Sequence, residues 1–174
     1  MAMIVTDMLR GFLEPGYPLY CGESSRRIIE PVKMLLKEKE GKEAIIFLRD
    51  EHNENDPEFR VFPRHCIKGS DQSKVINELH SYWQRGIDVP KTRYSGFYDT
   101  DLNKILLQNV SKDEDVTVVG VCTDICVLYT CSDLRNRDYS VIVPRNCVAS
   151  FDEKAHEWAL LHMRKILAVK ITES

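Results

Sequence analysis

A buried strand that runs through a short turn into a helix, between Val116 and Asn136, constrains the fold of this chain most. The segment 116–121 is a run of β-branched residues and glycine without charge, which is typical of a strand covered on both faces. From Val127 onward, apolar residues recur at helical spacing. A strand of this kind, followed at once by a helix, is the repeating unit of a parallel α/β sheet.

The turn between this strand and this helix contains Cys122 and Cys126. We expect Thr123 or Asp124 to cap the helix, because either side-chain oxygen can accept a free amide hydrogen. Cys126 then lies in the first helical turn, where unpaired N–H groups and the helix dipole stabilise a thiolate. It is a candidate nucleophile, and the alternative is a small buried apolar side chain.

Strands and helices alternate along the rest of the chain. Further strands are expected at 4–6, 44–48, 86–89, 139–143 and 168–171, with the third stopped by Pro90. Helices are expected from Ser24 or Ser25 to Gly41, and at 73–84, 101–107 and 153–166. The alternation predicts a three-layer α/β/α, Rossmann-like fold with six parallel strands, and residues 1–174 are expected to form a single domain.

Composition excludes several classes of protein. The 174 residues are 43% hydrophobic and 29% charged, with a formal net charge of -3, so neither nucleic acid nor an anionic membrane is an expected partner. The apolar runs are of strand length and the N-terminus lacks a basic region, which argues against a membrane span and a signal peptide. Six cysteines without a secretory signal favour free thiols and a cytoplasmic location.

Polar residues follow the predicted strands and should meet at one edge of the sheet. Asp7, Lys91 and Cys126 form the first group: a carboxylate can act as general base to a thiol, and an ammonium stabilises the thiolate. Taken singly, each residue has an alternative to a catalytic role. Asp7 could be a strand-end residue bonded to local amides, and Lys91 could be a solvated charge. Their shared position at strand ends favours catalysis.

A second group lies in the long polar loop 49–69. Asp50 and His52 point the same way in an extended segment, and His65 returns after a turn. One acid and two histidines suit a divalent first-row metal and leave positions open, although ordinary surface polarity is the alternative. The remaining histidines, 80, 156 and 162, are expected to be surface or interface residues.

Together these residues resemble the isochorismatase-like cysteine hydrolases, and among them the nicotinamidases (pyrazinamidases). The likeness covers nearly the whole chain. Four stretches carry it: Val5-Thr-Asp7 to Phe12, Asp50-Glu-His52 with Phe62-Pro-Arg-His65, Pro90-Lys91-Thr-Arg-Tyr94-Ser-Gly-Phe97 with Thr100-Asp101-Leu102, and Val119-Gly-Val-Cys122-Thr-Asp-Ile-Cys126-Val. The last is the most specific.

The resemblance implies a role for each residue. Asp7 is the general base and Cys126 the nucleophile beside Lys91, with an oxyanion hole made by backbone N–H groups of Cys122 and Cys126. A cis peptide is implied between Val121 and Cys122. Further roles are implied for metal ligands and for residues around the substrate ring: Asp50, His52, His65 and Glu58 for the metal, and Phe12, Phe62, Tyr94 and Val121 for the substrate.

The implied activity is hydrolysis of nicotinamide to nicotinate and ammonia through a thioester, in NAD salvage. One divalent metal ion is expected, zinc first, with iron or manganese as alternatives. The rival substrates are other small amides, carbamoyl or ureido compounds. Isochorismatase activity and a catalytically silent binding protein are the more distant rivals, and a homo-oligomer is an open alternative.

Two positions depart from the family pattern. Leu9 stands where the opening motif often has glutamine, and Cys122 stands where a small or aliphatic residue is usual. A second thiol so close to Cys126 raises the hypothesis of a disulfide between the two on oxidation.

Overall fold

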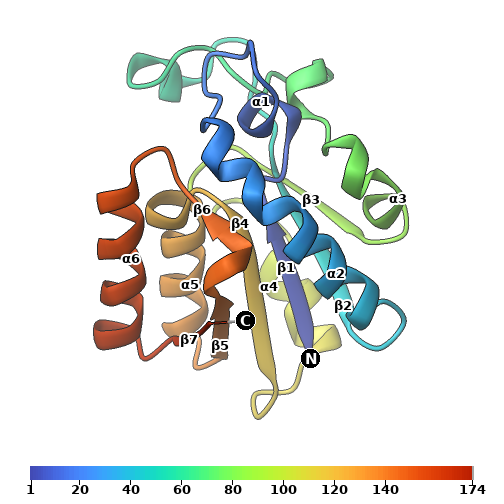
Figure 1. Ribbon diagram of the computed structural model, residues 1–174. Coiled ribbons are helices and arrows are strands. Elements are labelled where there is room, and N and C mark those ends of the chain that lie inside the picture. Colours follow the sequence, from blue (N-terminus) through green and yellow to red (C-terminus); the bar gives the residue numbers. More distant parts are fainter. Residues whose placement is uncertain (174) are drawn as a thin grey trace.

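The computed structural model describes residues 1–173, which form a parallel β-sheet between two layers of helices (Figure 1). The expected α/β/α fold class is therefore confirmed. The strand order is β3-β2-β1-β4-β5-β7, and all strand pairs are parallel. The six strands of this path are β1 (Ala2–Thr6), β2 (Ala44–Asp50), β3 (Ile87–Lys91), β4 (Asp115–Val121), β5 (Ser140–Pro144) and β7 (Lys170–Thr172).

A seventh strand corrects the expected count of six. β6 (Val148–Ala149) pairs with the end of β4, at Gly120 and Val121. Two residues have no periodicity to detect, so a strand of this length gives no signal in the sequence.

Helices cover both faces of the sheet because the strand side chains alternate between two apolar cores. Met3 and Val5 of β1 face the core with Leu36, whereas Ile4 faces the core with Leu106. The first core is covered by α1 (Arg10–Leu13), α2 (Ile29–Lys39) and α3 (His80–Trp83), and the second by α4 (Leu102–Asn109), α5 (Leu128–Arg135) and α6 (Glu153–Ile166). Figure 1 shows α2 in front of the sheet and α4 behind it.

The helix expected at 73–84 is only partly present. The chain makes single 3-10 turns at Asp71–Ser73 and Asn77–Leu79, and the α-helical part is reduced to α3. Between these turns Val75 forms an antiparallel bridge with Leu9, which keeps this stretch extended. The apolar residues of this stretch are therefore spaced as in a helix because they are buried against another segment, although the chain is not helical there.

Two further boundaries differ from expectation. β3 continues through Pro90 to Lys91, which is possible because β3 is an edge strand and needs no N–H donor on its outer side. The segment after Gly22 starts as a 3-10 helix, Glu23–Ile28, and the Ser25 hydroxyl donates to the Gly22 carbonyl. Ser24 and Ser25 are thus not the N-cap of α2.

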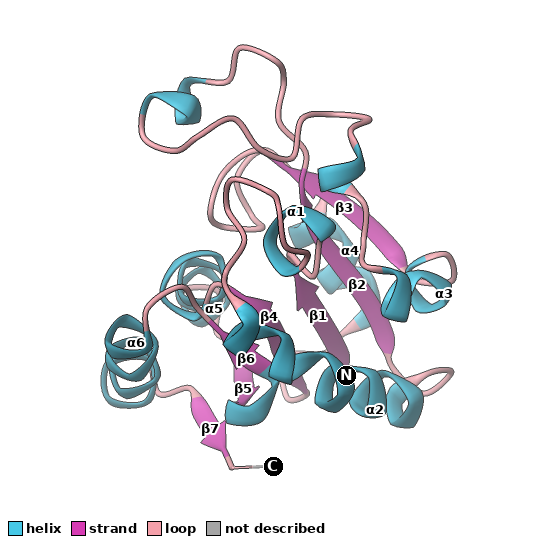
Figure 2. Ribbon diagram, turned by 45° about the horizontal axis from the view of Figure 1, so that its top comes forward, coloured by secondary structure: helices cyan, strands magenta, loops and turns pink. Residues whose placement is uncertain are grey.

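β1 is the point where the strand order reverses, since β2 and β3 lie on one side of it and β4 and β5 on the other. Ligands of such sheets bind beyond the carboxyl ends of the strands at this point. Figure 2 shows the long loops gathered at that end. Along the described residues, no helix is long and apolar enough to cross a membrane.

Candidate active site

Asp7, Lys91 and Cys126 come together at the carboxyl ends of β1, β3 and β4. The Lys91 Nζ atom lies 2.8 Å from Asp7 Oδ2 and 3.5 Å from the Cys126 sulfur, and it also pairs with Asp50. All four side chains are buried, and Cys126 retains 7% exposure. The sequence prediction that these groups converge is correct.

The backbone around Asp7 aims its carboxylate into this group. Asp7 has a positive φ of 51°, and its N–H donates to the Leu48 carbonyl at 2.9 Å. Asp7 Oδ1 accepts the Asp50 N–H at 2.8 Å. The second carboxylate oxygen is thereby left for Lys91 and the thiol.

Cys126 lies in a π-helical turn, Thr123–Val127, that leads from β4 into α5. This confirms its expected place in the first helical turn, but Thr123 and Asp124 do not act as caps. Thr123 Oγ1 is hydrogen-bonded to His156 Nδ1 at 2.8 Å, and Asp124 Oδ1 accepts from the Ser150 hydroxyl. Both side chains attach the turn 122–127, called here the nucleophile turn after its candidate nucleophile Cys126, to the segment around the start of α6.

His156 is consequently buried, which corrects its assignment as a surface or interface residue. Burial lowers the pKa of His156 below the usual 6.5, so the neutral ring is favoured. His156 differs from an ordinary helical histidine only in its hydrogen bond to Thr123. The sequence alone does not show that these two residues lie together.

The close approach of β1 and β4 explains the glycine before the turn. Gly120 has a φ of +112°, and a Cβ atom there would lie 1.9 Å from the Thr6 carbonyl oxygen. One residue further along, the peptide between Val121 and Cys122 is cis, as the resemblance implies. Glycine is therefore required at this position to bring β4 and the nucleophile turn against β1.

Burial and paired charges set the protonation of the group. Burial, with a smaller contribution from Asp50, raises the pKa of Asp7 to about 6. Burial raises the pKa of the Cys126 thiol well above 9, against the opposing effect of Lys91. A carboxylate with a pKa near neutrality is suited to accept and return a proton at physiological pH.

Lys91 and Asp50 form the charged pair of the site. Burial alone would lower the pKa of Lys91, but Asp50 and Asp7 outweigh it, so the pKa is raised and the ammonium is retained. Burial alone would raise the pKa of Asp50, but Lys91 and then His52 outweigh it, so this carboxyl is ionised.

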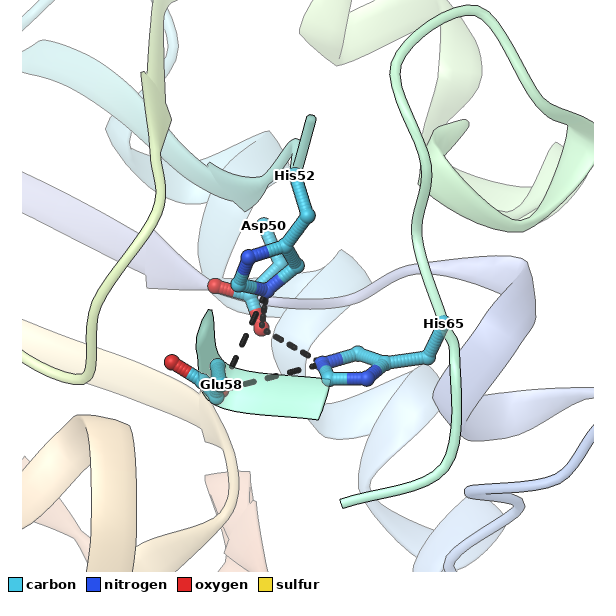
Figure 3. Close-up of side chains that lie close together, drawn as sticks. All are labelled: Asp50, His52, Glu58 and His65. Atoms are coloured by element: carbon cyan, nitrogen blue, oxygen red, sulfur yellow. Dashed lines mark ion pairs between the residues drawn. The ribbon is translucent and has the colours of Figure 1, made fainter. Parts of the chain in front are cut away.

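A second cluster adjoins the first through Asp50. In Figure 3 the side chains of Asp50, His52, Glu58 and His65 point toward one another. Asp50 Oδ2 lies 3.6 Å from His52 Nε2 and 3.7 Å from His65 Nε2. Glu58 Oε1 lies 3.9 Å from each of the same two nitrogens.

These spacings fit a metal ion. Ligand atoms bound at about 2.0–2.2 Å around one first-row divalent ion are separated by about 3.3–3.6 Å in tetrahedral geometry, slightly closer than here. All four side chains are buried. Among residues 1–173, His52 Nε2 and Glu58 Oε2 find no hydrogen-bond partner, which is costly for buried polar atoms unless something binds them.

Two neighbours orient the histidines. His52 Nδ1 lies 3.3 Å from Asp56 Oδ2, and Arg93 Nη1 donates to Asp56 Oδ1 at 2.9 Å. His65 Nδ1 lies 2.8 Å from the Pro63 carbonyl. Such partners fix which ring nitrogen faces a metal. Asp56 was not predicted, because nothing in the polar loop singles out one acid among several.

Both clusters open onto one pocket. Asp7, Asp50, Glu58, His65 and Cys126 line it. The wall includes all four residues predicted for substrate contact and three that were not: Phe12, Phe62, Tyr94 and Val121, and in addition Leu19, Ile125 and Phe151. Phe151 lies in the turn between β6 and α6, far in sequence from the recognised motifs.

Comparison with known proteins identifies the family. The model of the isochorismatase domain matches residues 1–174, the whole chain. The chain belongs to the isochorismatase family.

Solved structures of this family superpose over nearly the full length. The nicotinamidase/pyrazinamidase PncA of Bacillus subtilis has 32% identity and a TM-score of 0.92, covering 99% of this chain and 98% of its own. The pyrazinamidase of Pyrococcus horikoshii, solved with zinc, has 30% identity and a TM-score of 0.86, with coverage of 99% and 98%. The N-carbamoylsarcosine amidase of Thermoplasma acidophilum has 28% identity and a TM-score of 0.86, with coverage of 98% and 94%.

The chain thus has the fold of an isochorismatase-family hydrolase, with its candidate nucleophile and candidate metal ligands on one pocket. Within that family fold, the sequence motifs identified the groups that converge. The segment 150–156, which contacts the nucleophile turn and lines the pocket, was not identified because its two bonds to that turn, from Ser150 and His156, join residues distant in sequence.

Proposed function

We propose that the protein is a metal-dependent nicotinamidase, which hydrolyses nicotinamide to nicotinate and ammonia. The observation that carries the proposal is that Cys126 and the buried group of Asp50, Glu58 and His65 line the same aromatic-walled pocket. A nucleophile at one end and a site for a ring nitrogen ligand at the other suit an aromatic amide. The similarity to nicotinamidases and pyrazinamidases over the full chain supports it.

The reaction begins with proton transfer from Cys126 to Asp7, because the raised pKa of Asp7 makes it an adequate base near neutral pH. The ammonium of Lys91, 3.5 Å from the sulfur, stabilises the thiolate that forms. The thiolate then attacks the carboxamide carbon. We assign the backbone N–H groups of Cys122 and Cys126 to the resulting oxyanion.

The tetrahedral adduct collapses as ammonia leaves with the proton that Asp7 holds, and a thioester remains on Cys126. Asp7 next removes a proton from water, which attacks the thioester carbon. The adduct expels the Cys126 sulfur, which takes the proton back from Asp7, and nicotinic acid leaves. Its carboxyl proton passes to ammonia in solution, which gives nicotinate and ammonium. Each proton that Asp7 accepts is therefore returned within the cycle.

Asp50, His52, Glu58 and His65 would hold the metal, with zinc first and iron or manganese as alternatives. When bound, the ion supplies a Lewis acid that anchors the heteroaromatic ring and polarises water. Phe12, Phe62 and Tyr94 would enclose the ring and fix its carboxamide at the sulfur.

The test is ammonia release from nicotinamide with metal supplied. The wild type is expected to be active and Cys126→Ala inactive. Cys131→Ala is the matched control, because Cys131 is fully buried in α5 and is not among the residues that line the pocket, and it should retain activity. Absence of ammonia from the wild type would remove the nicotinamidase proposal, and an active Cys126→Ala would remove the mechanism.

The similarity to an N-carbamoylsarcosine amidase supports a second candidate, a small carbamoyl or ureido compound. The same assay with such amides distinguishes the two. We expect nicotinamide to be preferred, because a carbamoyl compound has no ring nitrogen that could bind the proposed metal ion.

We further propose that residues 1–174 act as one domain on a small-molecule amide in NAD salvage. Six free cysteines support a reducing compartment such as the cytoplasm.

A further inference from the structure

Two buried thiols, those of Cys21 and Cys122, lie against one another beside the pocket. Their sulfur atoms are 3.6 Å apart, and the side chains are 4% and 5% exposed. Cys122 lines the pocket together with Cys126. The proposed reaction uses the backbone N–H of Cys122, and it uses neither sulfur of this pair.

The pair joins two parts of the pocket wall. Cys21 follows Leu19 in the loop after α1, and its N–H donates to the Phe12 carbonyl at 2.8 Å. Leu19 and Phe12 both line the pocket. Cys122 is the residue from which the nucleophile turn starts. A bond between the sulfurs would therefore tie this wall to the turn that carries Cys126.

The other cysteines have different neighbours. Cys126 faces Lys91, the Cys66 sulfur lies 3.6 Å from the Gln72 carbonyl, and the Cys147 sulfur lies 3.4 Å from the Asn146 side chain. Within residues 1–173, Cys21 and Cys122 are the one pair of thiols that are hydrogen-bonded to each other. The disulfide hypothesised from the sequence, between Cys122 and Cys126, thus has a better placed competitor.

We propose that Cys21 and Cys122 are an oxidative modification site, at which a hydroperoxide joins the two sulfurs in a disulfide and reversibly inactivates the pocket. In the first step the O–O bond of hydrogen peroxide breaks, one sulfur becomes a sulfenic acid and water leaves. In the second step the other thiol attacks that sulfur, the S–S bond forms and a second water leaves. Two thiols lose two electrons and two protons, and the peroxide takes them up.

Formation of the disulfide would shift Cys122, where the nucleophile turn begins. An S–S bond is about 2.05 Å long, so the two sulfurs must approach by about 1.5 Å. Cys122 contributes a proposed oxyanion donor, and misplacement of a reacting group by about 1 Å can cost about 100-fold in rate. This effect on rate rests on the proposed function, whereas formation of the disulfide does not.

The chemical test uses the Cys126→Ala chain, in which the nucleophile cannot take part. The protein is treated with hydrogen peroxide, alkylated with N-ethylmaleimide in denaturant, and digested with trypsin without reduction. Cleavage after arginine and lysine gives peptide 11–26, with Cys21, and peptide 113–135, with Cys122 and Cys131. We expect the two peptides to be linked, with fragmentation placing the link at Cys122.

Cys21→Ser in the same background should give no linked peptide, and Cys147→Ser should leave the link intact. Recovery of Cys21 and Cys122 as alkylated thiols would overturn the proposal. A link between Cys122 and Cys126 in the oxidised wild type, in place of the one to Cys21, would also overturn it.

The activity test compares wild type with Cys21→Ser during peroxide treatment. We expect the wild type to lose nicotinamide hydrolysis by about 100-fold, in proportion to the linked fraction, and to recover it with dithiothreitol. Cys21→Ser should be inactivated at least about ten-fold more slowly. A linked enzyme with full activity contradicts the inactivation. A wild type without any nicotinamidase activity contradicts the proposed function instead, and the peptide map still decides the disulfide.

Discussion

At the scale of residues, the charge of Lys91 allows two carboxylates and a thiol to share one buried site. Its Nζ atom pairs with Asp7 and Asp50 and lies 3.5 Å from the Cys126 sulfur. Without it, Asp50 would keep only His52 and His65 as pairing partners, and Asp7 would lose the cation that lies 2.8 Å from its carboxylate. The ammonium therefore contributes to stability, in addition to the role proposed for it beside the Cys126 thiolate.

Replacing Lys91 with methionine should destabilise the protein by about 3–5 kcal/mol, because a buried ion pair loses one partner while the other charges stay buried. The free energy of unfolding in urea, without added metal, measures this. Lys74→Met is the control, since Lys74 forms an exposed pair with Asp71 and should leave stability unchanged. A Lys91→Met protein as stable as the wild type would contradict the charge assignment.

At the scale of elements, the site depends on how β4 and the nucleophile turn are held. β4 lies against β1 with Thr6 opposite Gly120, and the turn is bonded to the segment 150–156. The first contact fixes the height of the turn above the sheet. The second fixes its side chains against α6.

Gly120→Ala should destabilise the protein by at least about 3 kcal/mol, because the new Cβ atom would meet the Thr6 carbonyl oxygen in addition to the cost of a positive φ. Gly41→Ala isolates the second effect, since Gly41 also has a positive φ but has nothing within 4 Å of a Cβ atom. It should cost about 1–2 kcal/mol. Urea unfolding of both variants gives the comparison, and equal losses would show that the close approach is absent.

His156 makes the attachment of the turn sensitive to pH. Burial is the main cause of its lowered pKa, with Glu153 and Glu157 acting in the opposite direction and Arg145 and Arg27 in the same direction. Because the folded pKa lies below the unfolded one, the unfolded chain binds the proton first as pH falls. The contribution of His156 to stability is therefore complete above about pH 6.5 and is lost as pH falls through the folded pKa.

His156→Gln should consequently lose less unfolding free energy than the wild type between about pH 7.5 and about pH 5.5. Urea titrations at several pH values measure the two slopes. His162→Gln is the control, because His162 is a partly exposed residue of the same helix, stacked on Trp158. Parallel curves for wild type and His156→Gln would mean that the buried ring does not titrate in this range.

The sequence predicted correctly those elements that are determined by residues close to one another in the chain. The bounds of α6, Glu153–Ile166, were correct at both ends, because Asp152 caps the helix through the Ala155 N–H and the apolar spacing is regular. The stretch around Val75 was misread as helical, since its contact with Leu9 lies in another segment. At the site, motifs identified Asp7, Lys91 and Cys126, whereas Asp56 and Phe151 depend on contacts that only the folded chain makes.

At the scale of the whole molecule, the candidate metal ligands Asp50, His52, Glu58 and His65 lie where several segments meet. Asp50 ends β2, Glu58 lies in the 3-10 turn Pro57–Arg60, and His65 precedes the loop back to α3. A cation bound to all of them would hold these loops together against the sheet. Metal binding and global stability should therefore be coupled.

Removal of the metal with a chelator should lower the melting temperature, and adding back zinc, iron or manganese should restore it. At a free metal concentration about 100 times the Kd, the stabilisation amounts to about 2.7 kcal/mol. Glu58→Gln should retain the fold and show a smaller shift, and Glu54→Gln, in the same loop but outside the group, should behave as wild type. A melting temperature indifferent to every divalent ion tested would exclude a metal site here.

The central claim is that Cys126 attacks the amide from within the pocket, and mass spectrometry of enzyme quenched with acid during nicotinamide turnover tests it most directly. The account predicts that peptide 113–135 has the added mass of a nicotinoyl group, localised by fragmentation to Cys126, and that the adduct disappears when substrate is exhausted. Acylation at another residue while nicotinamide is being consumed would contradict it.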